Sequence, residues 1–254
     1  MKIISYNVNG IRAAIKKDLV GYIQQEQPDI LCFQETKAHI IDIDAVLFES
    51  LGYHTFWNSA EKKGYSGVGI ISKINPKNVI MGCEIPKIDF EGRVITAVYD
   101  NFVLVNTYFP SGTSGVERQA YKMEFLEAYL HFIENLKKTY KKVIICGDYN
   151  ICHREIDIHD PKGNKNNSGF LPEERAWMDT WFGLGMIDTF RHIYPEEKAQ
   201  YSWWSQRFNA RANNKGWRID YFSITENLLP ELKSAAIHPE VKHSDHCPIS
   251  IQIF

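Results

Sequence analysis

The sequence predicts a four-layered α/β sandwich, in which two mixed β-sheets pack face to face and helices cover their outer faces. Apolar runs of strand length alternate with helical patterns along the whole chain. Each half of the chain also contains a strand that runs into an Asn- or Asp-x-Asn turn, at Lys2–Asn9 and at Lys142–Asn150. Two related sheets packed together would bring both turns to one rim. No linker or low-complexity tract divides the chain, so we expect a single domain over residues 1–254.

The first half of the chain is expected to form short strands around one helix. The first strand is predicted over Ile3–Val8. A helix with Ile15, Leu19, Tyr22 and Ile23 at helical spacing follows it and ends before Pro28. Further strands are predicted over 30–33, 67–72, 93–99 and 102–107, with a hairpin turn at 100–101 between the last two.

The second half contains two longer helices and a final strand. A helix is predicted from Glu117 to Tyr140, with its apolar face formed by Tyr121, Phe125, Tyr129, Ile133 and Leu136. Pro172 is expected to open another helix, whose inward side chains are Trp177, Trp181 and Leu184. The isoleucines at 249, 251 and 253 alternate with Ser250 and Gln252, which predicts a half-buried strand at the end of the chain.

Composition excludes several classes of protein. The chain is 44% hydrophobic and 24% charged, which suits a soluble globular domain, and no apolar run is long enough for a membrane span. The first residues lack the order of a signal peptide. The five cysteines form no C-x-x-C pair, so we expect neither a zinc site nor disulfides, and a cytoplasmic location. The net charge of −2 disfavours a protein that coats DNA but not an enzyme with one basic face.

Polar residues recur directly after the apolar strands, where catalytic groups are usually mounted. Carboxylate and amide oxygens at such a rim suit a hard cation such as Mg²⁺. A carboxylate with a histidine can supply a general base and a hydrogen-bond donor to the phosphate. The candidates are Asn7, Asn9, Gln34, Glu35, Asp148, Asn150, Asp220, Asp245 and His246.

Each candidate taken alone also has a plainer interpretation. Glu35 could cap a helix or stay solvated, and Gly-Asp-x-Asn around Asp148 is common turn chemistry. The segment Ser244–Pro248 is more telling, because Asp245 precedes His246 and a buried strand follows; Asp220 could orient the His246 ring. No phosphate-binding glycine motif is present, and Gly64–Gly69 does not meet the nucleophile-elbow pattern, so no nucleotide cofactor is expected.

Residues Tyr201–Arg218, here called the basic aromatic segment, contain four cations and no acid. Four rings, at Trp203, Trp204, Phe208 and Trp217, alternate there with the cations Arg207, Arg211, Lys215 and Arg218. Cations can pair with phosphates and rings can pack on a sugar or base, so the segment suggests contact with nucleic acid. The alternative is a solvated charged loop with buried tryptophans.

Together these residues make the sequence resemble the exonuclease III family of abasic-site endonucleases, within the endonuclease/exonuclease/phosphatase superfamily. The resemblance runs from residue 2 to residue 254. It is carried by nine motifs in order: Asn7–Arg12, Gln34–Lys37, Gly64–Gly69, Glu91–Arg93, Asn106–Pro110, Gly147–Asn150, Asn164–Phe170, Gly216–Tyr221 and Ser244–Pro248.

The resemblance implies a role for each matching position. The metal, Mg²⁺ or alternatively Mn²⁺, would be held by Glu35 with Asn7 and Asp245, and by Asp148 and Asn150. Asp148, helped by Asn150, would align or deprotonate the attacking water, while His246, paired with Asp220, and Tyr108 would stabilise the phosphate. An extruded abasic sugar would enter a pocket of Trp203, Trp217 and Ile219. DNA contacts are expected at Arg12, Lys17, Tyr65, Asn164, Asn167 and Arg207.

The implied function is DNA repair by Mg²⁺-dependent hydrolysis of the phosphodiester 5′ to an abasic site in double-stranded DNA. The resemblance also allows 3′-5′ exonuclease and 3′-phosphatase activities. We expect a monomer of the short bacterial type, cytoplasmic and associated with the nucleoid. Two departures stand out: position 9 is Asn, and the loop Ser111–Val116 lacks an arginine that some relatives insert into the duplex. The rival interpretations are a phosphodiesterase for inositol phosphates or sphingolipids and a catalytically silent DNA-binding protein.

Overall fold

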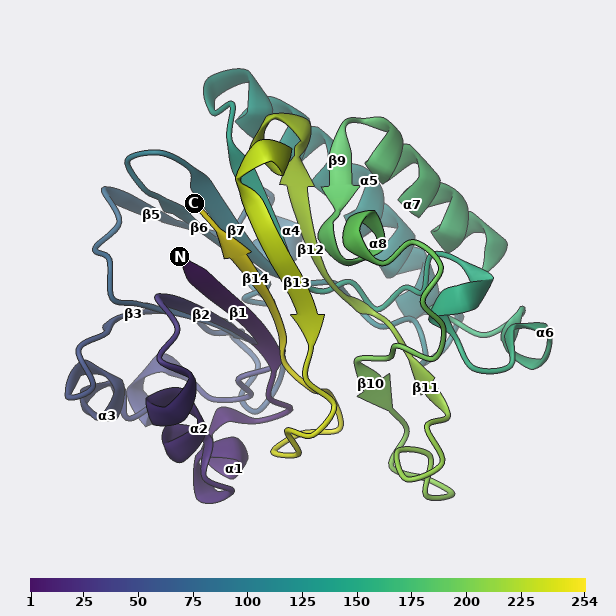
Figure 1. Cartoon of the computed structure of the whole chain (residues 1–254), viewed down its shortest axis with the longest axis horizontal. Coiled ribbons are helices and arrows are strands. Elements are labelled where there is room, and N and C mark those ends of the chain that lie inside the picture. The colour runs from purple at the N-terminus through teal and green to yellow at the C-terminus, as the bar shows by residue number, and fades with distance from the viewer.

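Two six-stranded sheets form the centre of the computed structural model, which describes residues 1–254 (Figure 1). The first sheet is mixed, because β1 and β2 are parallel and the other neighbours are antiparallel. Its strands, in spatial order, are β13 (Leu232–Ile237), β14 (Ile249–Ile253), β1 (Lys2–Asn7), β2 (Ile30–Gln34), β4 (Val68–Ser72) and β3 (His54–Asn58).

The second sheet repeats this plan, with β7 and β8 as its parallel pair. Its strands, in spatial order, are β5 (Asn78–Met81), β6 (Val94–Val98), β7 (Val103–Tyr108), β8 (Val143–Asp148), β12 (Asp220–Thr225) and β9 (Met186–Asp188). A separate two-stranded ribbon of β10 (Trp203–Trp204) and β11 (Gly216–Trp217) projects beside the rim.

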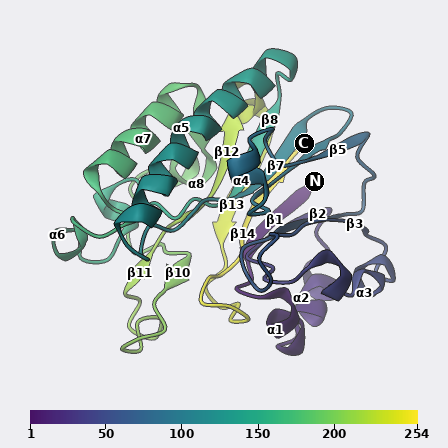
Figure 2. The same ribbon diagram turned by 180° about the vertical axis from the view of Figure 1, so that it is seen from behind.

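Helices cover the outer face of each sheet, on opposite sides of the molecule in both views (Figures 1 and 2). The first sheet carries α1 (Ile11–Lys16), α2 (Leu19–Glu26) and α3 (Ala45–Glu49). The second carries α4 (Pro86–Asp89), α5 (Val116–Thr139) and α7 (Pro172–Gly183). The remaining helices are α6 (Pro161–Asn164) and α8 (Thr189–Ile193), with 3₁₀ turns η1 (Ile40–Asp42), η2 (Glu155–Asp157) and η3 (Glu226–Glu231). None of these helices has the length and apolar character of a membrane span.

Three hydrophobic cores fill the spaces between the four layers. Ile3 and Ile70 of the first sheet meet Leu104 and Ile144 of the second in the central core. The two outer cores lie between each sheet and its helices. This arrangement confirms the predicted four-layered fold. All five cysteines are buried and free.

A polar clamp joins the two sheets just below the rim. The Gln34 amide donates to the Asn106 side-chain oxygen (2.7 Å), and the Asn106 amide donates to the carbonyls of Phe33 (3.0 Å) and Gly69 (2.8 Å). Buried amides must be hydrogen-bonded, so these contacts fix the distance and register between the sheets. Gln34 directly precedes Glu35 in the sequence, and Asn106 lies two residues before Tyr108.

Two local predictions were wrong. The single helix expected after Arg12 is two helices, because Asp18 adopts the left-handed conformation (φ 71°) and its side chain accepts from the Gly21 N–H. The final strand is not half-buried: Ser250 is buried along with the isoleucines, and only Gln252 is exposed. The reason is that β14 lies inside the sheet, between β13 and β1.

Candidate active site

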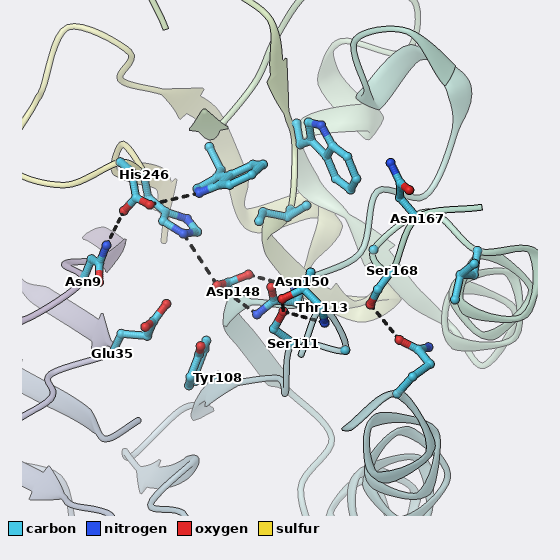
Figure 3. Close-up of a pocket in the computed structure, with 18 of the residues that line it drawn as sticks. Asn9, Glu35, Tyr108, Ser111, Thr113, Asp148, Asn150, Asn167, Ser168 and His246 are labelled. Atoms are coloured by element: carbon cyan, nitrogen blue, oxygen red, sulfur yellow. Dashed lines mark hydrogen bonds and ion pairs between the residues drawn. The ribbon is translucent and has the colours of Figure 1, made fainter. Parts of the chain in front are cut away.

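Polar side chains from both sheets converge on a groove of about 770 Å³ at the rim (Figure 3). The parallel pairs β1/β2 and β7/β8 both end there, so the residues that follow these strands meet. Eleven of the predicted site residues line the groove: Asn9, Glu35, Tyr108, Asp148, Asn150, Asn167, Trp203, Trp217, Ile219, Asp245 and His246. Asn7 and Asp220 lie buried beneath this lining.

Asn7 links the two sheets at the base of the groove. Its amide nitrogen donates to Glu35 Oε1 (2.9 Å) and to Asp148 Oδ2 (2.8 Å). Its amide oxygen accepts from the Asn9 backbone N–H (3.0 Å), which fixes the orientation of the amide. Asn7 therefore holds the two carboxylates together, and in this arrangement its oxygen is turned away from them.

Four non-glycine residues around the groove have a left-handed backbone: Asn9 (φ 47°), Glu35 (φ 50°), Lys37 (φ 48°) and Asn150 (φ 52°). This conformation costs free energy for L-residues other than glycine, least for asparagine. Strain of this kind concentrates at functional sites, where the surrounding structure holds it in place.

Asp148 is the most completely enclosed carboxylate of the groove. Its Oδ1 accepts from the Asn150 N–H (2.8 Å), and its Oδ2 accepts from the Asn150 amide (3.2 Å) as well as from Asn7. Burial, and after it the nearby charge of Asp220, raises the pKa of Asp148 to about 8. A carboxyl group with a pKa near the working pH is well suited to act as a general base.

His246 faces Asp148 from the other side of the groove, and Asp220 lies behind it. His246 Nδ1 is 2.9 Å from Asp220 Oδ2, and its Nε2 is 3.8 Å from Asp148 Oδ2. Burial alone would lower the pKa of His246, but the charge and hydrogen bond of Asp220 raise it to about 10. The ring is therefore an imidazolium at neutral pH and presents an N–H to the groove.

The donor set fits a hard divalent cation. Glu35, Asp148 and His246 bring their ligand atoms within 4.8 Å of one another. Burial opposes ionisation of Glu35, yet Lys37, 2.8 Å from its Oε2, lowers the pKa of this carboxyl below its usual value. A cationic His246 is not a metal ligand, which leaves the oxygens of Glu35 and, once it is ionised, of Asp148 as the core of an oxygen site of the kind Mg²⁺ prefers. Asp245 lies farther along the groove, and its oxygens accept from Asn9, Ser244 and Trp203.

Tyr108 reaches the groove from the end of β7. Burial, followed by the charge of Glu35, raises its pKa well above the usual value, so its hydroxyl stays protonated. The guanidinium of Arg93 lies 4.7 Å from the Tyr108 ring centroid and donates to the Tyr108 carbonyl (2.9 Å). Tyr108 is thereby fixed as a hydroxyl donor.

An apolar wall closes one end of the groove. The Trp203 and Trp217 rings meet edge to face with centroids 5.8 Å apart, and both pack against the cluster that contains Ile219 and Phe170. Trp203 Nε1 also donates to Asp245 Oδ2 (3.2 Å), so the wall is attached to the polar part of the site.

The expected DNA contacts are distributed unevenly. Asn167 lines the groove, whereas Arg12, Lys17 and Arg207 are exposed outside it. The Asn164 side chain is engaged by the carbonyls of 159 and 160 and by the Asn167 amide. The Tyr65 hydroxyl, outside the groove, accepts from Arg93 (3.0 Å) and Arg118 (2.5 Å).

For two arginines of the basic aromatic segment, the expected pairing with phosphate was wrong. Arg218 is 1% exposed and forms ion pairs with Asp157 (2.8 Å) and Asp188 (2.7 Å). Arg211 donates to four backbone carbonyls between 239 and 246 and lies over the Trp204 ring. The acids that neutralise Arg218 come from outside the segment, which is why the local excess of cations misled. Arg207 and Lys215 remain exposed.

Sequence reasoning missed two groups beside the candidate catalytic residues. Lys37 pairs with Glu35 and donates to the Asn9 side-chain oxygen. The motif Gln34–Lys37 indicates no role for its lysine from the sequence alone. Lys122 is fully buried behind the groove, although a lysine on a helix is ordinarily solvated. Its place between Tyr121 and Phe125 of the apolar face was the available signal.

Comparison with known proteins gives consistent matches over the whole chain. The model of the endonuclease/exonuclease/phosphatase family matches residues 4–246. An exodeoxyribonuclease of Bacillus subtilis is 44% identical over 254 residues, covering 100% of this chain and 99% of that protein. The DNA repair nuclease APEX1 of Danio rerio is 41% identical, over 99% of this chain and 81% of that protein.

Two solved structures share the complete fold, each covering 100% of this chain and 99% of the other. An AP endonuclease from Archaeoglobus fulgidus has a TM-score of 0.91 at 30% identity. A 3′ phosphatase from Neisseria, bound to a product DNA hairpin, has a TM-score of 0.92 at 26% identity.

Proposed function

Because the chain belongs to the endonuclease/exonuclease/phosphatase family, we propose that it cuts the DNA phosphodiester 5′ to an abasic site. The chain is an enzyme of DNA repair, a phosphodiester hydrolase with nuclease activity. The observation that carries the proposal is the convergence of Glu35, Asp148 and His246 beside an apolar wall. Exonuclease and 3′-phosphatase activity at the same groove are part of the proposal.

The residues divide the chemical task between them. Asp148 takes a proton from the attacking water, and Asn150 holds its carboxylate in place. His246, kept cationic by Asp220, donates to the phosphate, as does the Tyr108 hydroxyl. A general base supplies only roughly 10²–10⁴-fold, whereas enzymes commonly reach ~10⁶–10¹⁷-fold, so the groups that act on phosphate charge must supply most of the acceleration.

A divalent cation, proposed to be Mg²⁺ with Mn²⁺ as an alternative, fits the oxygen donors of Glu35 and Asp148. When bound, it neutralises charge on the phosphate oxygens. Glu35 is ready to hold it, because Lys37 and Asn7 keep its carboxylate ionised and oriented. Asp245 and Asn150 complete the proposed set, and the role expected for Asn7 becomes the positioning of the two carboxylates.

The apolar wall supports selectivity for a missing base. An abasic nucleotide has no stacking or pairing to lose, so its extrusion from the duplex costs less than that of an intact nucleotide. The wall of Trp203 and Trp217 would then exclude a nucleotide that carries a base. Double-stranded DNA is the proposed partner, bound by a monomer. The five free cysteines support a reducing, cytoplasmic setting.

Trp203→Ala is expected to weaken discrimination between abasic and intact duplex by roughly 10- to 100-fold, because it opens the wall. The ratio of kcat/KM for the two duplexes measures this. Trp203→Phe is the matched control, since it keeps a ring while losing the N–H bond to Asp245. If both variants lose discrimination equally, the bond to Asp245 and not the wall sets selectivity. Unchanged discrimination in both would remove the pocket role.

The reaction itself is tested with a labelled duplex that contains one tetrahydrofuran abasic analogue. Incubation with Mg²⁺ is expected to give a single cut on the 5′ side of the analogue, leaving a 3′-hydroxyl, and EDTA is expected to abolish it. Cutting that persists in EDTA would contradict the metal site. Binding without cutting would favour a silent DNA-binding protein. If the chain neither binds nor cuts the duplex, small phosphoesters become the expected substrates.

A further inference from the structure

A fully buried ion pair lies directly behind the groove. Lys122 of α5 and Glu174 of α7 have side chains of 0% exposure, and Nζ lies 2.6 Å from Oε1. Removing two charges from water costs free energy that their mutual attraction often fails to return, so stability alone is a poor reason for such a pair. Its other hydrogen bonds show which parts of the molecule it holds.

Lys122 holds the turn that carries the proposed general base. Its Nζ donates to the Asn150 carbonyl (2.9 Å). Asn150 itself has a left-handed backbone, and it donates through its backbone N–H and its side-chain amide to the two oxygens of Asp148. A shift of the Asn150 peptide would therefore move the Asp148 carboxylate relative to His246.

Glu174 holds the opposite part of the groove. Its Oε2 accepts from the backbone N–H groups of Gly169 (2.6 Å) and Leu171 (3.0 Å), and its Oε1 accepts from the Ser168 hydroxyl (3.3 Å). Gly169 supports the apolar wall, because a Cβ there would lie 2.9 Å from Trp217 Cζ3. The Gly169 carbonyl accepts from the Cys152 N–H (2.7 Å), which ties this segment to the turn after Asn150.

We propose that Lys122 and Glu174 are positioning residues, which keep the Asp148–Asn150 turn and the Gly169–Trp217 wall in one fixed arrangement. The inference rests on the proposed function. Neither residue touches the substrate; each acts through the backbone of a segment that lines the groove. The two helices α5 and α7 lie side by side on the second sheet (Figures 1 and 2), so the pair also couples the groove to the outermost layer.

The test is the double variant Lys122→Met with Glu174→Gln, which removes both charges while leaving an unbranched side chain at each position and an acceptor for Gly169. We expect kcat on the tetrahydrofuran duplex to fall roughly 10- to 100-fold, as small misplacements of catalytic groups do, with KM little changed. Discrimination between abasic and intact duplex is expected to fall in the same variant. The melting temperature is expected to stay near that of the wild type.

Lys142→Met is the matched control, because Lys142 pairs with Glu231 at the opposite end of β8 from Asp148. If the control and the double variant both cut like the wild type, the positioning role is wrong while the proposed function stands. A double variant without a cooperative thermal transition would also overturn the inference, since the pair would then serve folding. If the wild type and the control fail to cut, the proposed function itself has failed.

Discussion

Asp148→Asn is expected to lower kcat on an abasic duplex by roughly 10²–10⁴-fold, because the variant has no base to take the proton from water. Asn150 can still donate to an oxygen at position 148, so the turn should keep its shape. The bonds from Asn7 and from the Asn150 amide lose their acceptor, which destabilises the fold. Removing a buried charge that is repelled by Asp220 and Glu35 stabilises the fold and so offsets part of this loss.

We therefore expect the melting temperature of Asp148→Asn to change by only about 3 °C, or roughly 1 kcal/mol in a domain of this size. Single-turnover cutting and a thermal melt on the same preparation separate the two effects. Asp179→Asn is the control, because Asp179 is exposed and its ion pair is with His153, away from the groove. A melting temperature that fell in step with the rate would mean that Asp148 is needed for the fold and not for proton transfer.

Asp220→Asn is expected to move the pH–rate profile toward lower pH. In the proposed mechanism, His246 donates to the phosphate while it is protonated, which holds below its pKa of about 10, and Asp148 accepts a proton above its own raised pKa. The Asp220 charge raises both values, so its removal lowers both. At pH 9 the variant loses the imidazolium donor, and loss of one such donor typically costs roughly 10²–10³-fold in kcat.

The measurement is kcat/KM on the tetrahydrofuran duplex from pH 6 to pH 10, for wild type and variant. Both limbs of the profile should shift to the acidic side. The loss of kcat/KM relative to the wild type should therefore be smallest at the lowest pH. A loss of equal size at every pH would show that Asp220 holds the His246 ring in place without controlling its charge. Asp179→Asn again serves as the control, with an unshifted profile.

The rim of the groove was the most predictable part of the molecule, and the reason is local. Asn7, Glu35 and Asp148 each follow a short apolar strand, and strand ends of parallel pairs meet at one edge. Such patterns are visible in a few consecutive residues. The break between α1 and α2 was hidden because it depends on the left-handed conformation of Asp18, and hydrophobic spacing continues across it.

The groups that sequence patterns misjudged are those whose partners lie far along the chain. Arg218 is neutralised by Asp188, 30 residues before it, and by Asp157, 61 residues before it. Lys122 meets Glu174 across 52 residues. The number of cations can be counted from the sequence, but whether a cation is free to bind a phosphate depends on which acid the fold places beside it. A stretch rich in cations therefore predicts a binding face only after its internal pairs have been removed.

The pairing of β1 with β14 has a consequence for when this enzyme can act. Asn7 lies at the end of the first strand and His246 just before the last, and these two strands are neighbours in one sheet. Contacts of such long sequence separation are slow to form. A chain still being synthesised holds Glu35 and Asp148 but lacks its histidine until the final segment is made. On the proposed mechanism, cutting therefore requires that β14 has joined β1, and a chain without this final segment is expected to be inactive on DNA.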